Sequence, residues 1–273
     1  MKKIIRISTV PISLNIFCKG LLYDLSSQYE IIAVSSPGEA LNEIAAREKI
    51  RTIAVPMHRQ IAPVRDLIAL WQLIKLFYKE RPDMVHSITP KAGLLAMTAA
   101  KLARVPVRLH TFTGLIWPTS KGIKRKVLIT MDKLLCACAT HINPEGKGVR
   151  KEKITNKPLT VLGHGNVRGI DFNYYYPSQE IKLSAKALRE KLGITSDTFL
   201  FLFVGRIVRD KGITELIEAF QKASENLSRD AESFSKTALL LVGNEEKNLD
   251  PLPCTTKQLI KTLPNIYQLP HLT

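Results

Sequence analysis

The stretch "TFLFLFVGRIVRDKGITELIEAF", residues 198–220, decides the fold class of this 273-residue chain. Its first half is a short apolar run, typical of a buried parallel strand, and its second half has the spacing of an amphipathic helix. The strand passes into the helix through Gly205, Arg206, Lys211 and Gly212. Ligands of parallel sheets bind at the carboxyl ends of strands, and a helix N-terminus attracts anions. Spacing alone favours a diphosphate site and a plain solvated loop about equally.

The same alternation of strand-like and helical segments fills the rest of the chain, which is the signature of parallel sheets wrapped by helices. We expect strands at 3–9, 29–36, 50–56, 82–89, 105–114, 140–143, 198–206 and 237–246, with 265–270 closing the last unit. We expect helices at 13–27, 40–49, 64–80, 91–103, 120–139, 180–191, 213–223 and 255–263. The predicted class is therefore α/β.

Two domains are expected, because the alternation restarts after a Pro-containing linker. The predicted boundary gives an N-terminal domain at 1–173 and a second one at 174–273. The second domain has room for about three strands, which is small for an independent parallel-sheet domain. We therefore expect it to be incomplete.

The composition of the chain limits the classes of partner that it is expected to bind. The hydrophobic fraction of 45% is that of a soluble globular protein, and the formal charge of +16 implies acidic partners: nucleic acid, anionic lipid or phosphorylated small molecules. Neither zinc spacing nor an RNA-binding aromatic signature is present, which disfavours nucleic acid. No run approaches the roughly 20 apolar residues that span a bilayer, and the first ten residues suit a strand better than a signal peptide. We expect a cytoplasmic protein with peripheral membrane contact.

Polar side chains gather where two expected strands end. His86, Thr89 and Lys91 lie in "MVHSITPKAG", and His110 ends the next strand. Helix capping by Thr89 and Pro90 explains part of this cluster. Lys91 in the first helical turn is unfavourable to the helix dipole, which hints at an anionic ligand. A lone histidine such as His110 is more often structural.

Several other segments leave two interpretations open. The glycine-rich "GHGNVRGID", 163–171, suits a hinge or a loop that faces a cleft, and it does not match a dinucleotide fingerprint. The basic stretches 120–126 and 146–153 suit a solvated face or an anionic membrane. The apolar stripe of the helix at 64–80 is expected to be core packing rather than a lipid-binding face. Cysteines make no disulfide or metal framework, and Cys136 and Cys138 are expected to be buried thiols.

Taken together, these motifs resemble the retaining glycosyltransferases of family 4, which have the GT-B fold of two facing Rossmann-like domains. Residues 204–220 resemble that family's donor-phosphate motif. Residues 55–70, 82–114 and 162–171 resemble the branch that builds bacterial capsule, O-antigen and related glycans. The resemblance extends over essentially the whole chain, and it implies a GT-B fold with an incomplete second domain.

The resemblance also assigns roles to residues. It implies that Gly205, Arg206 and Lys211 bind the donor diphosphate, and that His110 and Thr113 are catalytic residues beside the transferred sugar. Many relatives have a histidine at the position of Thr113. The residues implied for the acceptor side and the cleft are Arg59, His86, Thr89, Lys91, Gly114, Gly165 and Asn166.

The implied reaction is transfer of a hexosyl or N-acetylhexosaminyl unit, with retention, from a nucleotide sugar to a polyprenyl-diphosphate-linked glycan. The resemblance implies a UDP-sugar rather than a GDP-sugar donor, undecaprenyl diphosphate as the carrier, no metal and no other cofactor. It places the protein at the inner face of the cell membrane, against an anionic surface, with no nucleic-acid partner.

One expected motif is missing. Family members continue with a segment reading roughly E-G-F-x-x-x-x-x-E, and nothing after Pro270 supplies it. The expectation is therefore a fragment of a longer product or a truncated remnant. The alternatives are a non-catalytic remnant that binds carrier lipid or a partner enzyme, and a nucleotide-sugar epimerase with the same two-domain fold.

Overall fold

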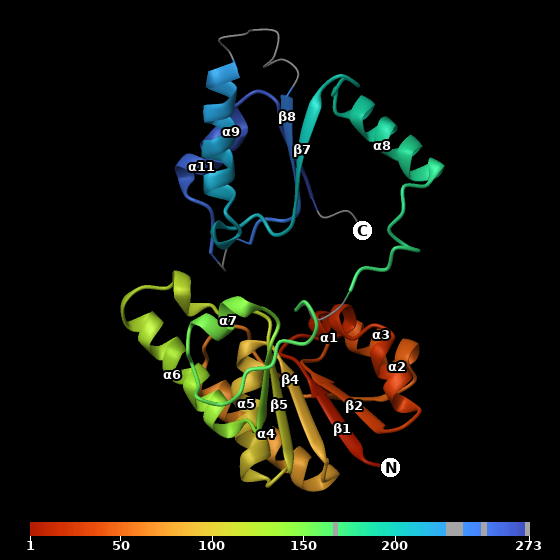
Figure 1. The fold of residues 1–273 in the computed structure, drawn as a ribbon, viewed down its shortest axis with the longest axis vertical. Coiled ribbons are helices and arrows are strands. Elements are labelled where there is room, and N and C mark those ends of the chain that lie inside the picture. The colour runs from red at the N-terminus through yellow and green to blue at the C-terminus, as the bar shows by residue number, and fades with distance from the viewer. Residues whose placement is uncertain (166–168, 228–236, 247–249, 271–273) are drawn as a thin grey trace. The chain divides into compact units, whose positions relative to one another are not determined.

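The computed structural model describes residues 1–165, 169–227, 237–246 and 250–270. It divides the chain into two compact units, unit 1 at Met1–Ile170 and unit 2 at Asp171–Thr273 (Figure 1). Within these described residues, each unit has its own parallel sheet, of six strands in unit 1 and three in unit 2. The predicted α/β class is confirmed.

The sheet of unit 1 has the order β3-β2-β1-β4-β5-β6, and all its pairings are parallel. Its strands are β1 (Lys3–Ile7), β2 (Glu30–Ser35), β3 (Arg51–Ala54), β4 (Met84–Ile88), β5 (Val107–Phe112) and β6 (His141–Pro144). The strand order reverses between β1 and β4. In open sheets of this kind, that reversal opens a crevice at the carboxyl ends of the two strands.

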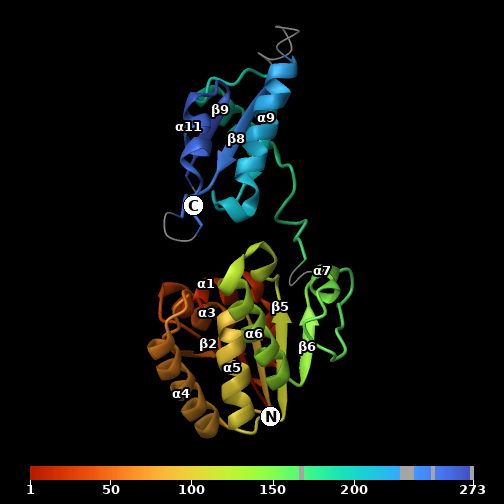
Figure 2. The same cartoon turned by 90° about the vertical axis from the view of Figure 1, so that its left-hand side faces the viewer.

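Helices cover both faces of this sheet. On one face lie α4 (Pro63–Glu80), α5 (Pro90–Leu102) and α6 (Gly122–Cys138), side by side in Figure 2. On the other lie α1 (Pro11–Phe17), α2 (Leu21–Ser26) and α3 (Glu39–Glu48). Alternate residues of each strand point to opposite faces, so Ile5 and Ile7 belong to the larger core beneath α4 to α6.

In unit 1, local chemistry breaks one expected helix, and short helical elements appear that the sequence analysis did not expect. The helix expected at 13–27 is interrupted at Gly20, whose φ of +80° is accessible to glycine and ends α1 before α2 begins. The additional elements are the 3₁₀ turn η1 (Trp117–Thr119) and α7 (Lys147–Lys151). As expected, Cys136 and Cys138 are buried and free of disulfides.

The apolar stripe of α4 is only partly core. Of the apolar residues at the predicted spacing, Phe77 is buried, and Leu70 and Ile74 are half-buried against the core. In contrast, Leu67 and Trp71 are 65% and 56% exposed, so the expectation of core packing is wrong for the outer half of the stripe. None of the helices in the described ranges is both long and apolar enough to cross a membrane.

Unit 2 is smaller. Its strands β7 (Phe199–Val204), β8 (Thr237–Val242) and β9 (Ile266–Leu269) form a parallel sheet in that order. Its helical elements are α8 (Gln179–Lys191), η2 (Arg209–Lys211), α9 (Ile213–Leu227) and α11 (Cys254–Thr262). Side chains of β8, α9 and α11 form a compact core. The edge strand β7 leaves large apolar side chains exposed, including Phe199 and Val204 at 64% and 70%.

Candidate functional site

Two threonines link the strand ends at the point where the order of the first sheet reverses. Thr9 follows β1 and Thr89 follows β4. Their hydroxyl groups share a hydrogen bond of 2.8 Å, and the Thr9 amide donates to the Thr89 hydroxyl at 3.0 Å. The Thr9 hydroxyl also accepts from the Ala92 amide in the first turn of α5. This network fixes the crevice edge where parallel sheets bind ligands.

Thr89 has an unusual backbone conformation. Its φ of +76° is in a region that β-branched residues rarely adopt. Its side chain makes no capping bond to α5, contrary to the expectation from sequence, because the hydroxyl contacts Thr9 instead. Pro90 does stand at the start of the helix, as expected. Strained residues of this kind gather at functional sites, so Thr89 supports a site at this edge.

Lys91 is held inside the protein. It is 8% exposed, and its ammonium group forms an ion pair with Asp66 of α4 at 2.7 Å and donates to the Gln60 carbonyl. These bonds satisfy the positive charge that the sequence left without a partner. Lys91 therefore connects α5 to α4 and to the loop before α4.

His86 belongs to a row of hydrogen-bonded polar side chains on the face of the sheet that α1 to α3 cover. Its Nδ1 contacts the Arg6 guanidinium, and its Nε2 lies 2.8 Å from the Thr111 hydroxyl. Burial first, and then the charge of Arg6, hold the pKa of His86 well below its ordinary value. The imidazole is consequently neutral at physiological pH and suits hydrogen bonding rather than charge pairing.

His110 lies in the core beneath α5. It is 1% exposed, its Nδ1 lies 2.8 Å from the Ser87 hydroxyl, and its ring packs edge-on against Phe112. Gly93 leaves the space for it, since a Cβ there would lie 2.4 Å from the ring. Burial lowers the pKa of His110 to about 3. The resemblance implied a place beside the transferred sugar, but the structure packs this side chain away from any surface.

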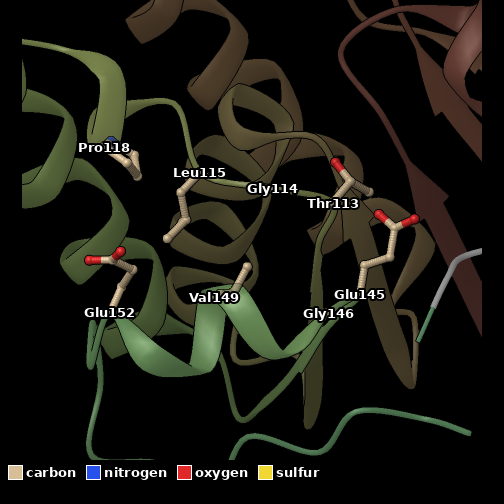
Figure 3. A pocket seen from close by; sticks show the side chains of 9 residues that line it. Thr113, Gly114, Leu115, Pro118, Glu145, Gly146, Val149 and Glu152 are labelled. Carbon is tan, nitrogen blue, oxygen red and sulfur yellow. The ribbon is translucent and has the colours of Figure 1, made fainter. Parts of the chain in front are cut away.

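A cavity of about 540 Å³ opens beside Thr113 and Gly114, where β5 and β6 end (Figure 3). Figure 3 shows Thr113 and Glu145 at one end of the cavity and Glu152 at the other, with apolar Leu115 between them. Within the described parts of the chain, neither carboxylate has a side-chain partner. Apolar walls with free carboxylates at the rim suit a hydroxyl-rich ligand such as a sugar.

The sequence did not point to Glu145 or Glu152 as site residues. The only available signal was the position of Glu145 directly after a strand end. A second cavity, of about 610 Å³, lies beside the same helix α7 and is basic. It is lined by Lys147, Arg150, Lys151, Leu159, Thr160, Val161 and Gly163.

The remaining acceptor-side residues fall in loops of unit 1. Arg59 is exposed before α4, and Gly114 follows β5 at the rim of the first cavity. Gly165 has a φ of +85°, and a Cβ there would lie 2.2 Å from the Glu145 carbonyl oxygen. It therefore lets the backbone at Gly165 approach the backbone of Glu145. Asn166 lies outside the described residues.

In unit 2, the loop after β7 is built on close backbone contact. The Gly205 amide donates to the Val242 carbonyl at 3.0 Å, and a Cβ on Gly243 would lie 1.9 Å from the Gly205 carbonyl oxygen. Gly243 therefore has to be glycine for the two strand ends to meet. Gly212, at φ +74°, ends η2 and starts α9. The loop 205–212 thus lies at a strand end and at a helix N-terminus, as the sequence predicts.

The two cations expected to bind the diphosphate are at the surface. Arg206 forms ion pairs with Glu246 at 3.0 Å and with Asp210 at 3.5 Å, and its side chain is 41% exposed. Lys211 is exposed, and its ammonium has no ion-pair partner among the residues that the structure describes. An anion at this strand end can bind Lys211 directly. It can bind Arg206 by displacing the carboxylates of Glu246 and Asp210.

Two family models match this chain. The "Glycosyl transferase 4-like domain" matches residues 24–143, and "Glycosyl transferases group 1" matches residues 184–260. Among solved structures, Anabaena HepE in complex with UDP and glucose covers the whole chain, with a TM-score of 0.73 at 14% identity over 70% of its own length. The fold is thus that of the GT-B glycosyltransferases. The chain belongs to family 4 of that class.

Two curated relatives of this chain are also glycosyltransferases. The capsular polysaccharide biosynthesis glycosyltransferase CapM of Staphylococcus aureus is 36% identical over 81% of this chain and 57% of its own length. An Escherichia coli UDP-Gal:alpha-D-GlcNAc-diphosphoundecaprenol alpha-1,3-galactosyltransferase is 29% identical over 66% of this chain and 46% of its own length. The chain therefore spans about half the length of these relatives.

Proposed function

We propose that the protein transfers a sugar from a nucleotide donor, UDP-linked, to an undecaprenyl-diphosphate-linked saccharide in bacterial surface polysaccharide synthesis. The observation that carries this proposal is the loop 205–212 in a family 4 chain, with Arg206 and Lys211 at a strand end and a helix N-terminus. The relatives named above act in capsule synthesis and on a diphosphoundecaprenol acceptor, which supports the same reaction here.

Charge neutralisation is the chemical task of this loop. When the bond between the sugar and the diphosphate breaks, negative charge develops on the leaving group. The guanidinium of Arg206 can form two hydrogen bonds to a phosphate, and the ammonium of Lys211 adds a point charge. Since these cations supply the positive charge, the proposed reaction needs no metal, and activity should persist in EDTA.

We place the acceptor on unit 1. The free carboxylates of Glu145 and Glu152 suit hydroxyl groups of a saccharide, and the Thr113 hydroxyl lies on the same cavity. The neighbouring basic cavity, with Lys147, Arg150 and Lys151, suits the diphosphate of a carrier lipid. Because this acceptor is embedded in a bilayer, the protein is expected to work at the inner membrane face.

Retention of anomeric configuration is part of the proposal. The E. coli relative forms an alpha-1,3 linkage from UDP-Gal, and an α-linked product from an α-linked donor requires retention. Characterising the product linkage by NMR tests this point. An inverted product would contradict it.

The test of the reaction is transfer of labelled sugar from a panel of UDP- and GDP-sugars to a polyprenyl-diphosphate-linked saccharide. Each charge-assisted bond is worth roughly 1.5–3 kcal/mol, so replacing both Arg206 and Lys211 by alanine should lower the rate by about two to four decades. The matched control is Lys222→Ala, which removes an exposed positive charge from α9. Turnover within a factor of two of wild type in the double variant, or an epimerised donor in place of transfer, would contradict the proposal.

A further inference from the structure

We propose that the outer surface of α4, α5 and α6 is the face with which the protein docks on a bilayer containing anionic lipids. The inference rests on the proposed function only in its choice of a membrane as partner. It adds the surface itself, which lies on three adjacent helices (Figure 2). This surface is made of exposed apolar and basic side chains.

Large apolar side chains are exposed on this helical layer. On α4 the apolar residues are Val64, Leu67, Ile68, Trp71 and Tyr78, between 52% and 72% exposed. On α5 and α6 they are Leu102, Ile123, Val127 and Leu134, between 41% and 81% exposed. Apolar groups concentrated on one face mark an interaction surface, whereas single exposed ones need no explanation.

The charge on this layer has one sign. The exposed charged residues of the three helices are Arg65, Lys75, Lys79, Lys101, Lys124, Arg125, Lys126 and Lys133. Every acidic residue of the same helices is engaged within the protein. Asp66 pairs with Lys91, Glu80 pairs with Lys3 and Arg51, and Asp132 accepts from Trp117. The surface therefore offers only positive charge to a partner.

The arrangement on α4 is that of an interfacial helix. Its exposed residues at 64, 67, 68, 71, 75 and 78 recur at helical spacing, opposite to the buried Ala69, Leu73 and Phe77. The Lys75 ammonium lies 3.3 Å from the centroid of the Trp71 ring. A tryptophan beside a lysine suits the boundary between acyl chains and headgroups, where the ring is buried and the ammonium meets phosphate.

Charge complementarity decides between a membrane and a second copy of this chain. A copy with the same face would bring eight exposed cations against eight others, whereas a bilayer with anionic headgroups attracts them. The exposed helix α8 lacks this asymmetry. On α8, Ile181 and Leu183 are 51% and 62% exposed, but Glu180 and Glu190 accompany its basic residues.

The tryptophans permit a direct test. The chain has two, of which Trp71 is 56% exposed and Trp117 is 3% exposed. In a Trp117→Phe variant, fluorescence reports Trp71 alone. Vesicles of phosphatidylcholine with phosphatidylglycerol should shift this emission to the blue and sediment the protein, and pure phosphatidylcholine vesicles should bind at least tenfold more weakly. Wild-type sedimentation provides the same readout if Trp117→Phe fails to fold.

Two variants locate the surface. Leu67→Asn with Ile68→Asn removes apolar contact, and Lys75→Glu with Lys79→Glu reverses charge; each should weaken vesicle binding at least tenfold. The matched control, Ile181→Asn with Leu183→Asn on α8, should bind as wild type does.

Equal binding of the α4 variants and wild type would overturn the inference. Absence of wild-type binding to anionic vesicles, or a dimer that the α4 variants abolish, would do so too. The vesicle assay contains no nucleotide sugar. Its outcome therefore stands apart from sugar transfer, and failed transfer with intact vesicle binding would count against the proposed reaction alone.

Discussion

At the scale of single residues, the two histidines on β4 and β5 show that a sequence does not tell which face of the sheet a side chain occupies. His86 and His110 both stand near the ends of strands, and both are candidates by position. Strand alternation separates their environments: His86 joins Arg6 and Thr111 on one face, whereas His110 is buried on the other beside Ser87. Which face is covered depends on helices far away in the chain, so the core position of His110 could not be predicted from its neighbours.

Asp132 is a buried acid that should make the stability of the protein depend on pH. It is 8% exposed and accepts from Trp117 Nε1 at 3.0 Å, and burial raises its pKa to about 6. The folded state therefore binds a proton that the unfolded state releases near pH 4, and stability falls as the pH rises from about 4 to about 6. Asp132→Asn keeps the acceptor for Trp117 and removes the charge.

We expect Asp132→Asn to raise the free energy of unfolding above pH 6 by up to about 3 kcal/mol, with a smaller gain at lower pH. Urea unfolding between pH 4.5 and 8 measures this. The control is Asp24→Asn, at an exposed position. A gain that does not change with pH would contradict the assignment to Asp132.

At the scale of elements, periodicity was a sound guide to strands and helices. The apolar runs and helical spacings predicted the parallel strands of both sheets, because burial on two faces leaves a nearly continuous apolar signal. Periodicity identifies an apolar face but not what covers it, which is why the outer stripe of α4 was predicted as core. The short α7 was missed because its sequence, "KGVRK", has no apolar period.

The edge strand β7 gives a prediction at this scale. Phe199 and Val204 are exposed on a strand whose other edge has no strand partner in the described ranges. Such edges promote self-association, so the chain should associate in a concentration-dependent way. Replacing both residues by lysine should reduce association without loss of stability, as analytical ultracentrifugation and thermal unfolding can measure. If instead the α4 variants abolish association, β7 is not its cause.

At the scale of the whole molecule, the two units have separate hydrophobic cores. Both tryptophans lie in unit 1, so tryptophan fluorescence reports that unit alone, while circular dichroism reports both. This difference makes it possible to ask whether unit 2 unfolds by itself.

Gly243→Val provides the perturbation. A Cβ at Gly243 would lie 1.9 Å from the Gly205 carbonyl, so valine should disrupt the end of the unit 2 sheet. We expect part of the circular dichroism signal to be lost at a lower urea concentration than in wild type. The midpoint of the tryptophan fluorescence transition should not change. A shift of the tryptophan midpoint by the same amount would show that the units unfold together.

Across the molecule, the sequence predicted the place of the loop 205–212 better than the contacts of the candidate side chains. The loop 205–212 has the expected place, because strand, glycine and helix follow each other in the chain. The pairing of Lys91 with Asp66 arises from a contact between segments and carries no local signal. The same holds for Glu145 and Glu152, whose carboxylates have no side-chain partner among the described residues.

Titration of UDP into the protein measures directly whether Arg206 and Lys211 bind the diphosphate of a nucleotide donor. Loss of two charge-assisted contacts should weaken UDP binding by on the order of 100-fold or more in the Arg206→Ala, Lys211→Ala variant. Lys222→Ala should bind UDP as wild type does. Equal UDP affinity in the double variant and wild type would contradict this role of Arg206 and Lys211.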